Sequence, residues 1–276
     1  MGKIGKNSLD IQESNRLSIL RILAGEDVLT RAELSRRTGL KQATITNIIN
    51  DFLASGVVSE TGALKGNLGR RSIGIRINAE KFNVVAIKIA RRSYSVGIFN
   101  IKNQLLEKEY QKLDPAAGAS AVLERIVSDA RSLMQKYGSC CAVGVAVPGP
   151  YLRREGRIAV MTEFAGWEKI DICKQLGAAF EQPVFVEHDA NAGALGEWSR
   201  SANIGRDDVL VHLLASEGIG AGVVIGGKII SGYRGIFGEI GHMSINAMGP
   251  RCLCGNRGCL EMYCSALWYG TPHIGV

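Results

Sequence analysis

The sequence lacks any apolar run long enough to cross a bilayer, which takes roughly 18 residues. The N-terminus, Met1-Gly-Lys-Ile-Gly-Lys-Asn, also lacks the apolar core of a secretory signal. These two absences argue against a membrane or secreted protein and predict a cytoplasmic one. Cysteine is scarce and odd in number, with seven in 276 residues, so we expect reduced thiols outside the motif described below.

Positive charge is concentrated in the N-terminal part of the chain. Residues 1–76 carry 12 Lys and Arg against 7 Asp and Glu, a balance of +5 out of the net +7. Such a basic segment is typical of a surface that meets nucleic acid, although a merely solvated basic surface gives the same charge. The 276 residues, 46% of them hydrophobic, are enough for two domains with cores of their own.

Apolar residues at helical spacing predict three helices near the N-terminus, over residues 10–24, 30–38 and 41–55. Thr30 followed three residues later by Glu33 fits a capping box at the start of the second helix. Gly39 provides the positive φ that a tight turn needs. Two short helices joined by such a turn are typical of a helix-turn-helix.

The polar side chains of this segment suit DNA. Those expected to contact bases or phosphates are Arg31, Lys41, Gln42, Thr44, Thr46 and Asn47. Short strands over residues 56–60 and 72–77 flank a basic loop and predict a wing, whose Arg70 and Arg71 would enter a minor groove. We therefore predict a winged helix-turn-helix DNA-binding domain over residues 1–79. The alternative is a three-helix bundle whose basic hairpin docks on another protein.

The remaining residues, 80–276, predict an α/β domain. Strands are expected over residues 83–90, 94–100, 104–112, 140–147, 184–187, 209–214 and 222–225. Helices are expected over residues 117–137, 170–180 and 190–199. Strands that alternate with helices in two successive groups indicate two lobes.

A cluster of potential metal ligands follows the last of these strands. Gly238-Glu-Ile-Gly-His242 precedes the run Cys252-x-Cys254-Gly-x-x-Gly-Cys259-x-Glu261. One imidazole and three thiols, from His242, Cys252, Cys254 and Cys259, form a closed tetrahedral set that suits Zn²⁺ in a structural role. The glycines between them let a short loop fold back on an ion. The alternative is a loop with unlinked cysteines.

The same motif resembles the signature of the ROK family, which contains sugar-responsive repressors and sugar kinases. The resemblance implies a ribonuclease H-like (actin-like ATPase) fold with two lobes and a sugar cleft between them. It also implies the repressor branch, because ROK repressors carry a winged helix in front of the family domain and the kinases do not.

Two loops that bind phosphate in ROK kinases are altered in this chain. The kinase run Asp-x-Gly-Gly-Thr corresponds to Lys88-Ile-Ala-Arg-Arg92, where side chains would crowd an approaching phosphate. The second loop, residues 216–222, keeps its glycines but contains Glu217, whose carboxylate would repel phosphates. We therefore expect no ATP and no enzyme activity. The alternative is an ATP-dependent ROK sugar kinase with a fused DNA-binding domain.

The resemblance implies that the sugar contacts are His188, Asp189, Glu239, His242 and Glu261. His188 and Glu163 each stand where the family has Asn, which leaves the identity of the sugar open. His242 would bind the metal through one ring nitrogen and the sugar through the other. Alternatively, Asp189 caps the helix that follows it, and Glu239 and Glu261 support the metal loop.

The resemblance extends to about Ala266 and fails in residues 267–276, which show no helical period. Family members continue further, so we expect a truncated or frameshifted product whose second lobe is incomplete and leaves apolar surface uncovered. The expected partners are a double-stranded DNA operator, bound by a homodimer, and an effector that is a monosaccharide, a sugar derivative or a protein. A sugar that favours one arrangement of the lobes would lower operator affinity.

Overall fold

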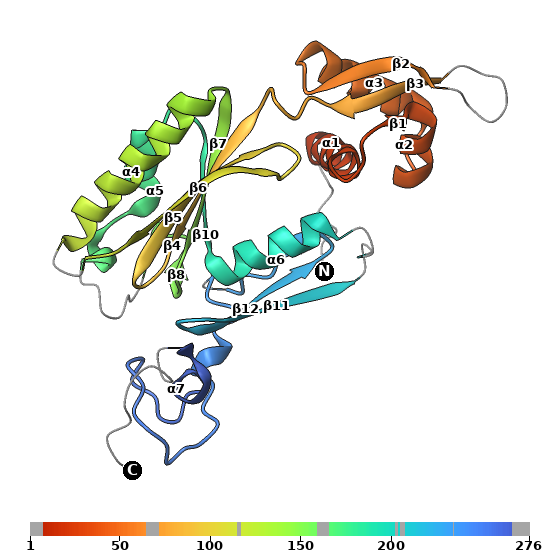
Figure 1. Cartoon of the computed structure of the whole chain (residues 1–276). Helices are drawn as coiled ribbons and strands as arrows, with labels where there is room; N and C mark the ends of the chain where they lie inside the picture. Colours follow the sequence, from red (N-terminus) through yellow and green to blue (C-terminus); the bar gives the residue numbers. More distant parts are fainter. Residues whose placement is uncertain are drawn as a thin grey trace. The chain divides into compact units, whose positions relative to one another are not determined.

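The computed structural model describes residues 8–64, 72–114, 117–158, 166–201, 204, 208–233 and 235–266. The chain has an α/β fold and forms two compact units (Figure 1). The first comprises Met1–Asn83 with Phe99–Leu106, and the second comprises Val84–Ile98 with Glu107–Val276. The first unit thus includes the tip of the hairpin formed by residues 93–112, whose two strands continue into the second unit. The predicted domain boundary between residues 79 and 80 stays a prediction. Within the described ranges, no helix is long and apolar enough to span a membrane.

The described part of the first unit combines three helices with a three-stranded sheet. Its elements are α1 Ser8–Ala24, β1 Leu29–Thr30, α2 Arg31–Thr38, α3 Gln42–Ala54, β2 Val58–Leu64 and β3 Ser72–Ile77. The strand order is β1-β3-β2, and both pairs are antiparallel. The predicted helices and the two predicted strands are confirmed. The short strand β1 was not predicted, because two residues carry no periodicity.

Local signals in the sequence set the ends of α2. The Thr30 hydroxyl accepts the Glu33 N–H at 3.2 Å, and the Glu33 carboxylate accepts the Thr30 N–H at 2.8 Å. Gly39 ends the helix with a φ of 72°, as a left-handed turn requires. The helices and the sheet share one core, in which fully buried residues include Ile19, Leu34, Ile45, Ile49 and Ile75. This core leaves the polar face of α3 outside.

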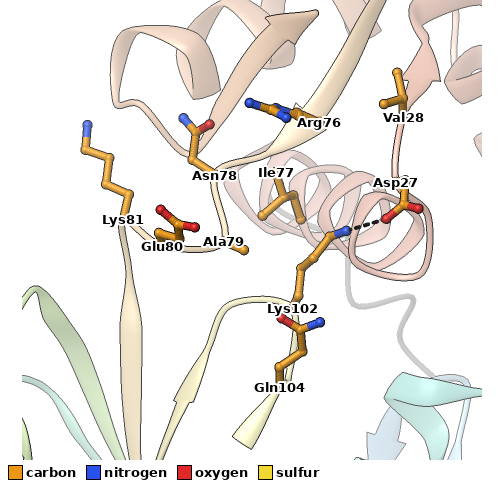
Figure 2. A pocket seen from close by; sticks show the side chains of 10 residues that line it. All are labelled: Asp27, Val28, Arg76, Ile77, Asn78, Ala79, Glu80, Lys81, Lys102 and Gln104. Atoms are coloured by element: carbon orange, nitrogen blue, oxygen red, sulfur yellow. Dashed lines mark hydrogen bonds and ion pairs between the residues drawn. The ribbon is translucent and has the colours of Figure 1, made fainter. Parts of the chain in front are cut away.

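The tip of the hairpin between β5 (Ser93–Asn100) and β6 (Leu105–Lys112) packs against this core through Ile101. Figure 2 shows Lys102 extending from the tip toward Asp27, with 3.1 Å between Nζ and Oδ1. Both residues line a hollow of about 640 Å³ in the first unit. Because the Asp27 side chain is fully exposed, this ion pair contributes little to stability.

The second unit contains a five-stranded sheet in the order β10-β7-β4-β5-β6. Its main elements besides β5 and β6 are β4 Asn83–Ile89, α4 Gly118–Tyr137, β7 Cys140–Val147, α5 Ile172–Ala179 and β10 Val184–His188. Shorter pieces are β8 Tyr151–Leu152, β9 Arg157–Ile158 and the 3-10 turn Trp167–Lys169. Helices α4 and α5 cover one face of the sheet, where Ile87, Ile126 and Leu176 are buried (Figure 1). The elements predicted in this stretch are confirmed.

A smaller antiparallel sheet follows, in the order β11-β12-β13. Its elements are α6 Asp189–Arg200, β11 Val209–Ala215, β12 Ile219–Ile225 and β13 Lys228–Ile229. The prediction that a glycine loop runs to Gly222 was wrong, because β12 begins at Ile219. The glycines serve packing instead: a Cβ on Gly222 would lie 2.2 Å from the Ala190 carbonyl oxygen, so its absence lets α6 approach the strand.

One face of this smaller sheet exposes an apolar row. Val209, Val211 and Leu213 on β11 are 59%, 62% and 60% exposed. Because alternate residues of a strand point to one side, the three side chains share a face. The chain then passes through the 3-10 turn Ile240–His242 and ends its described part with α7, Glu261–Cys264.

Candidate functional site

The predicted DNA contacts lie on the face of α3 that points away from the core. Gln42 and Asn47 are exposed, and Thr44 and Thr46 are half-buried. Ile45, Ile48 and Ile49, which alternate with them, are buried. Lys41 caps the helix through its backbone and leaves its side chain exposed. The helix therefore presents amides and hydroxyls, the groups that hydrogen-bond to base edges and phosphates.

The other predicted DNA contacts are basic. The guanidinium of Arg31, at the start of α2, donates to the Glu60 carboxylate on β2 at 2.9 Å. A phosphate would therefore have to compete with Glu60 for this side chain. Arg70 and Arg71, the predicted wing arginines, lie outside the described residues.

The four predicted metal ligands come together in one loop. Nδ1 of His242 lies 3.7 Å from Sγ of Cys252, and Sγ of Cys254 lies 3.7 Å from Sγ of Cys259. The four ligand atoms all lie within 4.8 Å of one another. The loop can close this tightly because Gly258, where φ is 63°, has no Cβ. A Cβ at this position would lie only 1.8 Å from the Asn246 carbonyl oxygen.

This spacing fits a tetrahedral ion. With zinc–sulfur bonds of about 2.3 Å, the edges of a tetrahedron measure about 3.8 Å. The observed 3.7 Å edges are close to that value. Burial and the neighbouring thiols of Cys254 and Cys252 raise the pKa of the Cys259 thiol to about 12, and a divalent cation would reverse this by stabilising the thiolates. The cluster can therefore hold a metal ion.

The five predicted sugar contacts line one cavity of about 160 Å³ in the second unit: His188, Asp189, Glu239, His242 and Glu261. They come from the end of β10, the start of α6, the metal loop and the start of α7. The cavity also takes in both turns that the sequence matched to kinase phosphate loops. Glu163, a further predicted difference from the family, lies outside the described residues.

His188 lines the cavity together with the carboxylates of Asp189 and Glu239. Nε2 of His188 lies 3.2 Å from Oδ1 of Asp189, which also accepts the Ala190 N–H at 2.8 Å. Asp189 is the first residue of α6 and does not cap it as the alternative supposed, because His188 holds the N-cap position and no side chain caps the helix. Its carboxylate lines the cavity. Burial raises the pKa of Asp189 and of Glu239, against the opposing charges of His188 and its neighbours. Carboxylates whose charged forms are disfavoured by burial, and that line a cavity, are typical of a binding site.

Gly149, in the turn after β7, makes room for these groups. A Cβ at this position would lie 2.6 Å from His188 Nε2 and 2.8 Å from Glu239 Oε1. Gly149 was not predicted as a site residue. The run Pro148-Gly149-Pro150 is typical of a strand end, and nothing local indicates that distant polar side chains approach it.

Glu261 is held by two partners from other parts of the chain. Oε1 accepts from Arg91 Nη2 at 3.3 Å and from Nη1 at 3.4 Å. Oε2 accepts the Ile219 N–H at 3.0 Å. The Arg91 N–H in turn donates to the Glu217 carboxylate at 3.0 Å. We call these bonds of Arg91 with Glu217 and Glu261 the Arg91 bridge.

From sequence, Arg91 was expected to crowd an approaching phosphate, and the Glu217 carboxylate was separately expected to repel it. The structure places the two residues together, and the Glu217 carboxylate accepts a hydrogen bond from the Arg91 backbone N–H. The available signal was the appearance of a basic residue in one altered loop and an acidic residue in the other. That signal is weak in a sequence, because 126 positions separate the two residues.

Two family models match the chain. The one described as ROK family matches residues 84–267, and the one described as winged helix-turn-helix DNA-binding matches residues 12–59. Together they match parts of both units.

Individual relatives include regulators and an enzyme. The xylose repressor of Bacillus subtilis (strain 168) is 29% identical over 258 residues, which are 92% of this chain and 66% of the repressor. A crystal structure of a ROK family transcriptional regulator, a homologue of the Escherichia coli MLC protein, has a TM-score of 0.73 at 23% identity, over 95% of this chain and 69% of that one. It supports the fold alone.

The ROK hexokinase from Thermus thermophilus has a TM-score of 0.56 at 33% identity, over 67% of this chain and 61% of that one. The chain thus spans about two thirds of the length of these relatives.

Proposed function

Because the chain belongs to the ROK family, we propose that it is a sugar-responsive DNA-binding repressor of carbohydrate genes that works in the cytoplasm. The single observation that carries the proposal is the pairing of a winged helix-turn-helix with a cavity lined by five polar side chains of the family's sugar-contact type. Similarity to the xylose repressor of Bacillus subtilis supports it. The first unit would bind an operator, and the second would bind the effector.

For DNA, we propose that the first half of α3 enters a major groove. Gln42 and Asn47 would contact base edges, while Thr44, Thr46 and Lys41 would contact bases or phosphates. Arg31 would contact a phosphate once it leaves Glu60, and Arg70 and Arg71 would enter the adjacent minor groove. A homodimer would place two such helices on a two-fold symmetric operator.

For the effector, we propose a monosaccharide or sugar derivative, bound by the hydroxyl-recognising groups that line the cavity. Carboxylates and imidazoles recognise hydroxyls well, because a buried polar group left without a partner is costly. The proposed contacts are His188, Asp189, Glu239, His242 and Glu261. A protein partner is the alternative effector, and the cavity chemistry favours the sugar.

We further propose that a structural Zn²⁺ is held by His242, Cys252, Cys254 and Cys259. When bound, the ion would neutralise the thiolates and fix the loop. Glu239 and Glu261 lie on either side of this loop in the sequence, so a fixed loop would keep both carboxylates at the cavity. The 3.7 Å ligand separations support this role.

Sugar must act on DNA affinity through two states of the protein. A sugar can release the operator only if it binds the low-affinity state more tightly than the high-affinity state. A coupling of about 1–3 kcal/mol, typical of allosteric proteins, would weaken operator binding about 5- to 150-fold.

The experiment that tests DNA binding is the selection of bound fragments from genomic DNA. We expect a shared, approximately palindromic sequence next to carbohydrate genes, with an affinity that falls steeply as salt rises. Failure to enrich any duplex, together with an affinity insensitive to salt, would favour a protein-docking regulator instead.

A second candidate is a ROK sugar kinase with a fused DNA-binding domain. The similarity to the Thermus hexokinase and the position of Asp189 in the cavity favour it. The residues 88–92 and Glu217 oppose it, because the Arg91 N–H that a phosphate would need already donates to Glu217. An ATP-coupled assay with a panel of sugars distinguishes the two, and we expect no turnover.

A further inference from the structure

Three bonds tie together turns that are distant in the sequence. Arg91 lies in the turn between β4 and β5, and Glu217 lies in the turn between β11 and β12. Glu261, the first residue of α7, accepts from the Arg91 side chain, and Glu217 accepts from the Arg91 backbone. Arg91 therefore links a turn of the five-stranded sheet to a turn of the smaller sheet at the cavity that both line.

The Arg91 bridge fixes the orientation of Glu261 and leaves part of the acceptor capacity of its carboxylate unused. One carboxylate oxygen faces Arg91, and the other accepts the Ile219 N–H. An ionised carboxylate has about four acceptor positions, and these three donors leave about one for a ligand. The Arg91 and Glu261 side chains are only 16% and 12% exposed, which makes their ion pair less screened than a surface pair. Glu261 is therefore oriented before any ligand arrives.

Charge gives Arg91 a second effect. The cavity is lined by two basic side chains, Lys88 and Arg91, and by four acidic ones, Asp189, Glu217, Glu239 and Glu261. Carboxylates this close repel one another, and the guanidinium offsets part of that repulsion. The remaining excess of acid would repel a phosphorylated ligand and accept an uncharged one that donates hydroxyl hydrogens.

The space around the Arg91 bridge favours a small ligand. A Cβ on Gly218 would lie 2.8 Å from Arg91 Nη2 and 2.9 Å from Glu261 Oε2, so this glycine makes room for the ion pair. The cavity volume of about 160 Å³ is below the roughly 300 Å³ at which ordinary ligand pockets begin. A small ligand suits this volume, and a nucleotide together with a sugar does not.

We propose that Arg91 is a positioning residue of the effector site, holding Glu261 for an uncharged monosaccharide and excluding its phosphate ester. The inference rests on the proposed function, since it presumes that the cavity takes a sugar. It adds the residue that orients a sugar contact, and it adds the charge class of the effector.

The first test measures sugar affinity by calorimetry. The probes are D-xylose, D-glucose and N-acetyl-D-glucosamine, each against its phosphate ester. We expect wild type to bind one free sugar at least 10-fold more tightly than the ester. Arg91→Gln should weaken that binding about 10- to 100-fold, the range for a lost hydrogen bond to a charged group. Arg91→Lys should recover part of the affinity.

Two controls separate positioning from general damage. Arg125→Gln changes an exposed arginine on α4, which does not line the cavity, and should leave sugar affinity unchanged. Adding Glu261→Gln to Arg91→Gln should cost less than the sum of the single changes, because both disrupt one pair. Strict additivity, or equal losses from Arg125→Gln and Arg91→Gln, would overturn the proposal.

A second test does not depend on sugar. Hydrogen exchange at the Ile219 amide should speed up in Arg91→Gln, because Glu261 then loses its fixed orientation. Unchanged protection would overturn the positioning role even if sugar binds. If wild type bound none of the probes while the Ile219 amide still responded, the sugar half of the proposed function and the charge class would fail, but the positioning of Glu261 would stand. Tighter binding of a phosphate ester would overturn the charge class.

Discussion

The winged helix of the first unit and the cavity of the second unit hold their polar side chains in opposite ways. On α3, Gln42 and Asn47 extend into solvent from a helix whose other face is buried. In the cavity, His188 and Glu261 are largely buried and already bonded to other residues of the chain. The first arrangement suits a large, hydrated polyanion, which exchanges water for its own contacts. The second suits a small ligand that must match groups fixed in advance.

Removal of the metal ligands should show the largest difference between the two regions. Cys259→Ser breaks the proposed tetrahedron, and structural zinc contributes on the order of 10 kcal/mol to the folding of small zinc domains. We expect loss of stoichiometric zinc, loss of sugar binding and increased amide exchange in residues 238–261. Amide exchange in α1 to α3 should stay the same.

Cys141→Ser is the matched control for this experiment, because it changes an exposed thiol outside the metal loop. Wild-type protein without zinc that still binds sugar would contradict the metal assignment. So would a Cys259→Ser variant that retains the metal and its affinity.

Gly149→Ala should produce the next largest effect, again confined to the cavity. The added methyl would collide with His188 and Glu239, so the turn or both side chains must move. We expect sugar affinity to fall more than 10-fold, while operator affinity in the absence of sugar is preserved. Gly177→Ala, where a Cβ would meet no atom within 4 Å, is the control. Equal affinities for the two variants would show that the close approach at Gly149 does not matter.

A change in α3, the helix proposed to enter the major groove, should weaken DNA binding and leave sugar binding unchanged. Asn47→Ala should weaken operator binding by about 1–3 kcal/mol and relax the preference for one base pair. Lys41→Ala should instead weaken all duplexes alike and reduce the salt dependence by about one ion. Sugar affinity should not change in either variant. Operator binding that resists both changes would mean that another surface contacts DNA.

The smallest expected effect concerns the capping box. The backbone N–H and hydroxyl of Thr30 lower the pKa of Glu33 below its ordinary 4.5. A lowered pKa gives stability that is present above 4.5 and is lost as pH falls through the folded value. Glu33→Gln should therefore destabilise the first unit by up to about 1 kcal/mol at pH 7, and this deficit should shrink below pH 4.5. Denaturant unfolding across this pH range measures it, and a deficit independent of pH would contradict the assignment.

The comparison also explains which parts of the structure could be predicted from sequence. The first unit depends on signals within a few residues of one another: the Thr30–Glu33 box, the turn at Gly39 and the helical spacing of Ile45 and Ile49. Its helices were therefore predicted to within a few residues. The metal cluster was predicted for the same reason, since its four ligands fall between residues 242 and 259.

The inner contacts of the cavity could not be predicted in this way. Arg91 and Glu261 are 170 positions apart, and no local pattern joins them. The glycines of residues 218–222 were matched to a phosphate loop, whereas Gly222 lets α6 pack on β12 and Gly218 makes room for the Arg91 bridge. A glycine signals close approach, but the sequence does not say what approaches.

The central claim is that a sugar in the cavity changes the affinity of the winged helix for DNA. The most direct test measures affinity for a selected operator at fixed salt, with and without a saturating free monosaccharide, in wild type and in Asp189→Asn. The account predicts a loss of at least 5-fold on adding sugar to wild type and little change in the variant. An operator affinity that no free sugar alters in the wild-type protein would contradict it.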